Sequence, residues 1–109
     1  MFNLYLSFLF FLLGCDISST GERLSGNGQD YRGCQTKTRS GRTCQAWDSQ
    51  KPHKHDRTPE NLPNYGLEGN YCRNPGKGAT IWCLTTDPNK MWEYCDPIMV
   101  TIPEPEVPS

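Results

Sequence analysis

The chain of 109 residues carries a formal net charge of −1, and only 35% of its residues are hydrophobic. A near-neutral chain lacks the basic balance that nucleic-acid binding needs, so no nucleic-acid partner is expected. So few apolar residues in so small a chain exclude an ordinary enzyme domain with a Leu-, Ile- and Val-rich interior. The six cysteines are therefore expected to stabilise one small domain through disulfides.

A hydrophobic segment opens the chain. Residues 4–13 are uncharged and mostly apolar, but a membrane span needs roughly 20 apolar residues, so no span is expected. We interpret residues 1–20 as a signal peptide or a non-native leader, although no Lys or Arg precedes the run. Cleavage after Gly14, Ser18 or Gly21 fits the sequence. A signal peptide predicts a secreted, extracellular protein and an oxidising compartment in which disulfides form.

The compact part of the chain is predicted at residues 33–99, and it shows no helical periodicity. Gly, Pro and Asn recur there at short intervals, which favours turns over helices. Short strands are expected around residues 42–47, 80–85 and 91–95. Residues 101–109 are rich in Pro and Glu and are expected to form an extended linker or tail.

Cysteine spacing alone leaves the disulfide pairing open. Six cysteines allow 15 pairings, and those of this chain are Cys15, Cys34, Cys44, Cys72, Cys83 and Cys95. No two of them form a Cys-x-x-Cys pair, which argues against a zinc ribbon or a thioredoxin-like redox site.

A more specific signal comes from short sequence blocks. Residues 70–75 read NYCRNP, a hallmark of kringle domains. Other blocks follow at the family's spacings: NGQDYRG (27–33), TCQAW (43–47), IWC (81–83), TTDP (85–88) and WEYCD (92–96). Over residues 23–100 the chain resembles kringles of the plasminogen and apolipoprotein(a) family, which implies one kringle domain with these bounds. The resemblance implies a small disulfide-rich fold, mostly loops and turns with a few short antiparallel β-strands and little or no helix.

The resemblance also implies a disulfide pairing. Aligned on the NYCRNP block, four of the cysteines take the second to fifth kringle positions. The family pattern then implies Cys44–Cys83 and Cys72–Cys95. Each bridge closes a loop of a few tens of residues, worth roughly 3–4 kcal/mol in the chain-entropy model.

The two ends of the domain depart from the family pattern. The first and last kringle cysteines fall at Arg23 and Val100, so the outer disulfide cannot form. Cys15 and Cys34 are left over, and they can pair with each other if Cys15 survives cleavage of the leader. If it does not, Cys34 is an odd thiol. It is then either a neutral substitution or the site of an intermolecular disulfide.

The resemblance implies a ligand site like that of lysine-binding kringles, which is a shallow trough. An acidic pair binds the ligand's ammonium, aromatic walls contact its methylenes and basic residues bind its carboxylate. The acidic positions correspond to Gly76 and Gly78, with Lys77 between them. The anionic end of the trough is therefore lost, and weak or absent lysine binding is expected. The walls correspond to Trp82 and Trp92, both aromatic in this chain.

The remaining trough positions are mixed. The basic positions correspond to Arg57, which is retained, and Met91, which is not basic; a third aromatic position is Leu84. We therefore regard Trp82, Trp92 and Arg57 as the vestige of a lysine site. In a second interpretation, the site binds a carboxylate-bearing ligand through Arg57 and the two tryptophans.

Several other positions match family residues that we interpret as structural. These are expected in the core: Trp47, Leu67, Tyr71 and Tyr94. Tyr31 is expected to pack against the disulfide-linked centre. The resemblance also implies a tight turn near Pro52, a place where a cis peptide bond can occur.

His53 and His55 form a His-x-His pair that could ligate a metal, but a surface or loop role is favoured. No nucleophile loop of serine-protease type is found, and the chain has no room for a protease domain. No catalytic residue, metal or cofactor is therefore expected.

The sequence thus predicts a secreted, non-catalytic kringle binding module with a degraded lysine site. Its expected partners are extracellular proteins, which could carry lysine or carboxylate groups, in the setting of fibrinolysis and proteolysis. One alternative is a fragment of a multi-kringle serine protease zymogen whose activity lies on an absent domain. Another is a degenerate copy without independent function.

Overall fold

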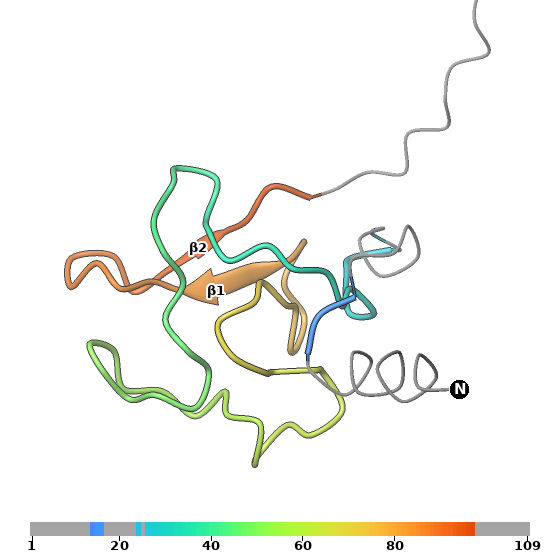
Figure 1. Ribbon diagram of the computed structural model, residues 1–109, viewed down its shortest axis with the longest axis horizontal. Helices are drawn as coiled ribbons and strands as arrows, with labels where there is room; N and C mark the ends of the chain where they lie inside the picture. Colours follow the sequence, from blue (N-terminus) through green and yellow to red (C-terminus); the bar gives the residue numbers. More distant parts are fainter. Residues whose placement is uncertain (1–13, 17–23, 25, 98–109) are drawn as a thin grey trace, which may run out of the picture.

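The computed structural model describes residues 14–16, 24 and 26–97, and they run mostly as loops and turns (Figure 1). Within these residues there are two strands and no helix: β1 (Trp82–Leu84) and β2 (Trp92–Tyr94). They pair antiparallel, with Cys83 opposite Glu93. The expected fold class, a small disulfide-rich kringle with little or no helix, is confirmed.

The strand predictions differ in outcome. Two of the expected strands are present but shorter than expected, while residues 42–47 form isolated bridges, Lys37 with Thr43 and Cys44 with Thr85. Backbone bonds leave this segment in two directions, since the N–H of Cys44 donates to Thr36 at 2.9 Å and that of Gln45 to Leu84 at 2.7 Å. One residue on each side is too little for a continuous ladder.

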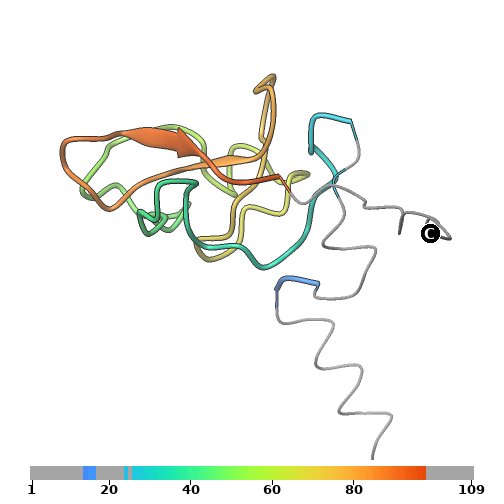
Figure 2. The ribbon, with the colours of Figure 1, turned by 90° about the horizontal axis from the view of Figure 1, so that it is seen from above.

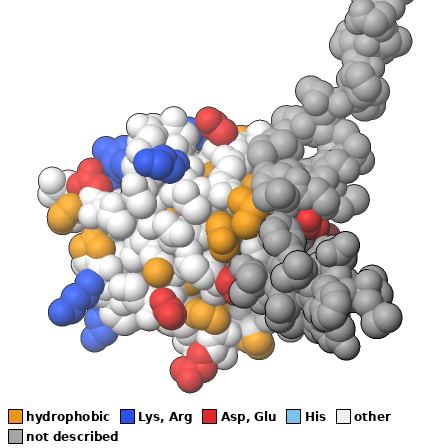
Figure 3. Space-filling model, viewed as in Figure 1, with side chains coloured by type: hydrophobic (Ala, Val, Ile, Leu, Met, Phe, Trp, Pro, Cys, Tyr) orange, Lys and Arg blue, Asp and Glu red, His pale blue; other side chains and the backbone are white. Residues whose placement is uncertain are grey.

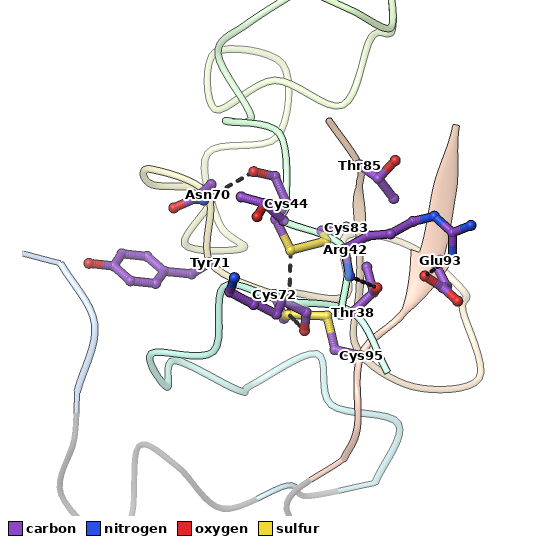
Figure 4. The surroundings of a disulfide bond; sticks show 12 residues. Thr38, Arg42, Cys44, Asn70, Tyr71, Cys72, Cys83, Thr85, Glu93 and Cys95 are labelled. Atoms are coloured by element: carbon purple, nitrogen blue, oxygen red, sulfur yellow. Dashed lines mark hydrogen bonds and ion pairs between the residues drawn. A yellow bond between two sulfur atoms is a disulfide. The ribbon is translucent and has the colours of Figure 1, made fainter. Parts of the chain in front are cut away.

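Two disulfides form the centre of the domain. The structure pairs Cys44 with Cys83 and Cys72 with Cys95, the pairing that the resemblance implies. All four cysteines are buried, and Sγ of Cys44 lies 3.7 Å from Sγ of Cys72 (Figure 4). The bridges connect the segment 36–47 to β1 and the segment 70–75 to Cys95, which follows β2, so residues far apart in the sequence are held in one cluster.

Apolar side chains surround the disulfides. Tyr31, Trp47 and Leu67 are buried in this core, as expected, together with Ile81 and Leu84. The indole N–H of Trp47 donates to the carbonyl of Tyr71 at 2.7 Å, so its one polar atom is satisfied. The side chain of Tyr71 itself is only half-buried. The peptide bond before Pro52 is cis.

A buried arginine was not foreseen. Only 1% of Arg73 is exposed, and its guanidinium donates to the carbonyls of Gly66, Gly33 and Cys72 at 2.7–2.9 Å. The same group lies over the ring of Tyr31. Burial, together with the nearby charge of Arg32, lowers the pKa of Arg73 to about 10. The side chain therefore stays charged at neutral pH and crosslinks three backbone segments through hydrogen bonds.

The remaining two cysteines are also paired. Cys15 forms a disulfide with Cys34, and the N–H of Asp16 donates to the carbonyl of Arg32 at 2.7 Å. Cys34 is therefore neither unpaired nor open to an intermolecular disulfide in this structure, and of the possibilities left open by the sequence the internal pair is the one observed. Residues 14–16 lie at the opposite end of the domain from the turn between the strands (Figure 2).

Some expectations fall outside the described residues. They concern the leader at residues 1–13 and 17–20, the missing cysteine positions Arg23 and Val100, and the tail at 101–109. Across the residues that the structure does describe, no helix has the length and apolar character to cross a membrane.

Candidate functional site

A hollow of about 360 Å³ opens beside the hairpin. It is lined by Arg57, Pro75, Lys77, Gly78, Trp82, Trp92 and Tyr94. Three aromatic rings and two cations thus meet in one place, and none of the lining residues is acidic. On the face drawn in Figure 3, by contrast, basic and acidic side chains are interspersed. Both charged residues of the lining, Arg57 and Lys77, carry positive charge.

The aromatic side of the hollow comes from both strands. Trp82 lies on β1, and Trp92 and Tyr94 lie on β2, with Trp82 directly opposite Tyr94. The rings contact edge to face, with centroids 5.9 Å apart for Trp82–Trp92 and 5.0 Å for Trp92–Tyr94. Trp82 packs in turn against buried Trp47 at 5.2 Å. This row of contacts fixes the rings before any ligand arrives.

Asn74 organises the turn beside the rings. Its Oδ1 accepts hydrogen bonds from the N–H of Gly78 and from the indole N–H of Trp82, both at 3.2 Å. Its Nδ2 donates to the carbonyls of Gly78 and Asn27 at 2.8 and 2.7 Å. One buried amide therefore positions both the turn and an aromatic wall. Sequence analysis used Asn74 only as part of the NYCRNP block and missed this role.

Gly76 and Gly78, which the resemblance aligned with acidic positions, have no side chain to offer to a ligand. Gly76 has a φ of +130°, a conformation that strains any L side chain. A Cβ at Gly78 would lie 2.8 Å from Oδ1 of Asn74 and 3.2 Å from Cδ1 of Trp82. Gly78 lines the hollow and Gly76 does not. A carboxylate cannot simply be placed at either position in this turn.

The charged residues of the hollow are two cations. Arg57 and Lys77 are exposed, and neither side chain forms an ion pair or a hydrogen bond with any residue that the structure describes. They come from two loops, and both reach the hollow. The site therefore presents two positive charges without a compensating anion of its own.

Other predicted positions lie elsewhere. Leu84, the third aromatic position of the family, is 2% exposed and belongs to the core. Met91 is 47% exposed and lies outside this hollow. Tyr94 was expected in the core but is only half-buried and lines the hollow. The i, i+2 spacing of Trp92 and Tyr94 on one strand could have indicated that both rings lie on the same face.

The two histidines have structural contacts. Nε2 of His53 lies 2.8 Å from the carbonyl oxygen of Asp87, and Nε2 of His55 lies 2.9 Å from that of Ser49. Nδ1 of His55 accepts a hydrogen bond from the N–H of Arg57. Within residues 14–16, 24 and 26–97, the only cluster of potential metal ligands is the four central cysteines, and their sulfurs are joined in disulfides.

A separate ion-pair network lies away from the hollow. Nε of Arg42 is 3.0 Å from Asp87, and its Nη1 is 3.3 Å from Glu93, which also accepts a hydrogen bond from Ser40 (Figure 4 shows Arg42 and Glu93). A backbone N–H of Asn89 and the Arg42 guanidinium lower the pKa of Asp87. Hydroxyl hydrogen bonds, from Thr38 first, lower the pKa of Glu93. This network ties the loop around Arg42 to β2.

Comparison with known proteins agrees with this geometry. The model of the kringle domain matches residues 24–99. The chain is 59% identical over 78 residues to apolipoprotein(a)-like protein 2 of Homo sapiens, which covers 72% of this chain and 59% of the relative. It is 55% identical over 71 residues to plasminogen of Capra hircus, covering 65% of this chain and 58% of the relative. The chain thus spans less than two thirds of either relative. By its sequence match and its disulfide-linked fold, the chain belongs to the kringle domain family.

Proposed function

We propose that this chain is a secreted, non-catalytic kringle binding module whose site no longer holds lysine ligands. One observation supports this above all. The hollow keeps its aromatic walls at Trp82 and Trp92, but its charged lining residues are both cations, Arg57 and Lys77. An aromatic wall can still accept the methylenes of a ligand. The charge that would hold an ammonium group is missing from the lining.

The energetics follow from the geometry. A lysine side chain in the hollow would bring its ammonium near Lys77 and find no carboxylate among the lining residues. A cation over an exposed aromatic ring is worth about 0.5–1 kcal/mol, which does not compensate for a lost ion pair and a like charge. The backbone conformation of Gly76 and the crowding around Gly78 oppose a simple return of the acidic side chains.

A binding role outside the cell is supported by the rest of the molecule. Three disulfides fit an oxidising compartment. The cysteine sulfurs are all engaged in these bonds, so no thiol is present to act as a nucleophile. We assign its partners to extracellular proteins in the setting of fibrinolysis and proteolysis, where the named relative plasminogen provides the link.

Similarity to plasminogen over part of that relative's length favours a second candidate. In it, this chain is one kringle of a multi-kringle zymogen, and the activity lies on another domain. A degenerate copy without its own function is a further alternative. Mass spectrometry of the secreted protein distinguishes the zymogen candidate from the others. One kringle of a longer zymogen gives tryptic peptides that continue beyond Ser109.

A titration with 6-aminohexanoate tests the proposed function. This ligand has the length and charges of a lysine side chain with a free carboxylate. We expect calorimetry to show no binding in the sub-millimolar range, because only the carboxylate end finds a partner. A sub-millimolar dissociation constant, measured on protein with all three disulfides verified, overturns the proposal.

A further inference from the structure

The charge of the hollow points to a ligand class of its own. Arg57 and Lys77 line it from two different loops, and both lack a partner among the described residues. The other lining side chains are uncharged. An unpaired cation at a partly enclosed site attracts an anion, and two cations attract a ligand with two negative charges.

The aromatic rings restrict where those negative charges can lie. The face of an aromatic ring carries negative partial charge, so it repels a carboxylate but packs well against methylene groups. A ligand must therefore direct its carboxylates to Arg57 and Lys77 and lay an uncharged stem on the rings of Trp82, Trp92 and Tyr94. The contacts of Trp82 with Asn74 and Trp47 hold this surface in place.

We propose that the hollow binds a dicarboxylate with a short apolar stem, presented in nature by a pair of acidic side chains on a partner protein. Arg57 pairs with one carboxylate through its planar guanidinium, and Lys77 with the other as a point charge. The proposal rests on the proposed function, since it assigns the ligand of the same binding site. Near Lys77, the proposed ligand carries a carboxylate where a lysine ligand would carry its ammonium group.

Four ligands with the same six-carbon stem test it: adipate, hexanoate, 6-aminohexanoate and 1,6-diaminohexane. Their binding is followed through the indole N–H signals of Trp82 and Trp92 in NMR spectra at low ionic strength. We expect adipate to bind tightest, hexanoate and 6-aminohexanoate less tightly, and the diamine not at all. Hexanoate binding as tightly as adipate overturns the proposal, because the second cation is then not used. Tightest binding of the diamine or of 6-aminohexanoate also overturns it.

Charge variants locate the site. Arg57→Gln and Lys77→Gln should each weaken adipate binding about fivefold, as expected for one exposed ion pair. Lys37→Gln is the matched control, because it removes the same charge at an exposed position outside the hollow, and it should leave affinity unchanged. Equal losses of adipate affinity in all three variants overturn the assignment of the site, because binding then depends only on the overall charge of the protein.

The protein source of the ligand is tested with two short peptides. Acetyl-Glu-Ala-Glu-amide should bind and shift the same indole signals, while acetyl-Gln-Ala-Gln-amide should not. Equal binding of the two peptides overturns the acidic-segment assignment. The outcomes separate the two proposals: sub-millimolar 6-aminohexanoate binding removes the proposed function, whereas adipate binding no tighter than hexanoate, with 6-aminohexanoate still weak, removes only this inference.

Discussion

The disulfide-linked centre and the hollow are built on the same two strands, but different interactions hold them. Covalent bonds and buried side chains fix the centre, where Cys83 on β1 joins Cys44 and Cys95 joins Cys72. Hydrogen bonds that Oδ1 of Asn74 accepts and edge contacts between rings fix the hollow, which is open to solvent. The centre cannot change without loss of packing, whereas the exposed side chain of Lys77 has no described partner to lose.

This difference indicates which part of the domain tolerates a change of residue. A change of residue in the centre alters volume or breaks a crosslink, so the family pattern is retained there. A change at an exposed lining position alters only the charge that a ligand meets. The chain can therefore keep the kringle fold while the charge that lines its hollow varies.

The largest expected effect tests the centre. Replacing both Cys44 and Cys83 with Ala should lower the free energy of unfolding by about 2–5 kcal/mol, because the bridge closes a long loop inside the core. The matched control is the double variant Cys15→Ala/Cys34→Ala. It removes a bridge that attaches residues 14–16 to the edge of the domain, so its effect on urea unfolding should be smaller. Equal losses in the two variants would contradict the distinction between a central and a peripheral disulfide.

The second prediction concerns Asn74, which connects the centre to the hollow. Asn74→Ala leaves the N–H of Gly78 and the indole N–H of Trp82 without an acceptor, at a cost of about 1–3 kcal/mol in unfolding free energy. The Trp82 indole signal should also move. Asn61→Ala is the control, since this exposed amide makes one side-chain bond to the carbonyl of Asp56 and should cost below about 0.5 kcal/mol. An unchanged Trp82 signal in Asn74→Ala would speak against the role assigned to this amide.

The third prediction tests the hollow alone. Lys77→Asp places a carboxylate at the site without using the constrained positions Gly76 and Gly78. It should raise the affinity for 6-aminohexanoate by up to about fivefold and leave the unfolding midpoint nearly unchanged. Lys37→Asp makes the same change of charge away from the hollow and should not alter binding. A gain of the same size in both variants would contradict the assignment of Lys77 to the site.

The smallest effect lies in the outer ion-pair network. The pKa values of Asp87 and Glu93 are lowered in the folded protein relative to 3.8 and 4.5, so the unfolded chain binds more protons in acid. Their stabilising contribution is present at neutral pH and is lost as the pH falls below about 4.5 through the lowered values. Arg42→Gln should reduce this acid dependence only in part, because hydrogen bonds from Asn89 and Thr38 are the leading causes. Urea unfolding between pH 3 and 6 measures the slope, and an unchanged slope in the variant argues against the contribution of Arg42.

Much of the centre could be predicted from the sequence. The family blocks carried the pairing of Cys44 with Cys83 and Cys72 with Cys95, and they placed Trp47 and Leu67 in the core. The two hairpin strands were expected around residues 80–85 and 91–95, short apolar and aromatic segments next to turn residues. The strand predicted at residues 42–47 was wrong. Strand formation depends on partners far away in the sequence, and this segment pairs with its partners only at single residues.

The site was less accessible to sequence reasoning. Trp82, Trp92 and Arg57 were named by alignment, and all three line the hollow. Tyr94 was placed in the core because it matches a family position that we interpret as structural, and only the register of the hairpin reveals its position. The role of Asn74 depends on four hydrogen bonds from three parts of the chain, and no local pattern encodes them.

The row of rings beside the hollow has an optical consequence. All three tryptophans of the chain belong to it, because Trp47 contacts Trp82 and Trp82 contacts Trp92. Emission from excited indole depends on the polarity around the ring, and Trp92 is 45% exposed while Trp47 is buried. The intrinsic tryptophan fluorescence of the protein therefore comes from one array whose outer ring forms the wall of the site. A ligand that covers Trp92 should shift that emission to shorter wavelength, so the protein carries its own binding reporter without a label.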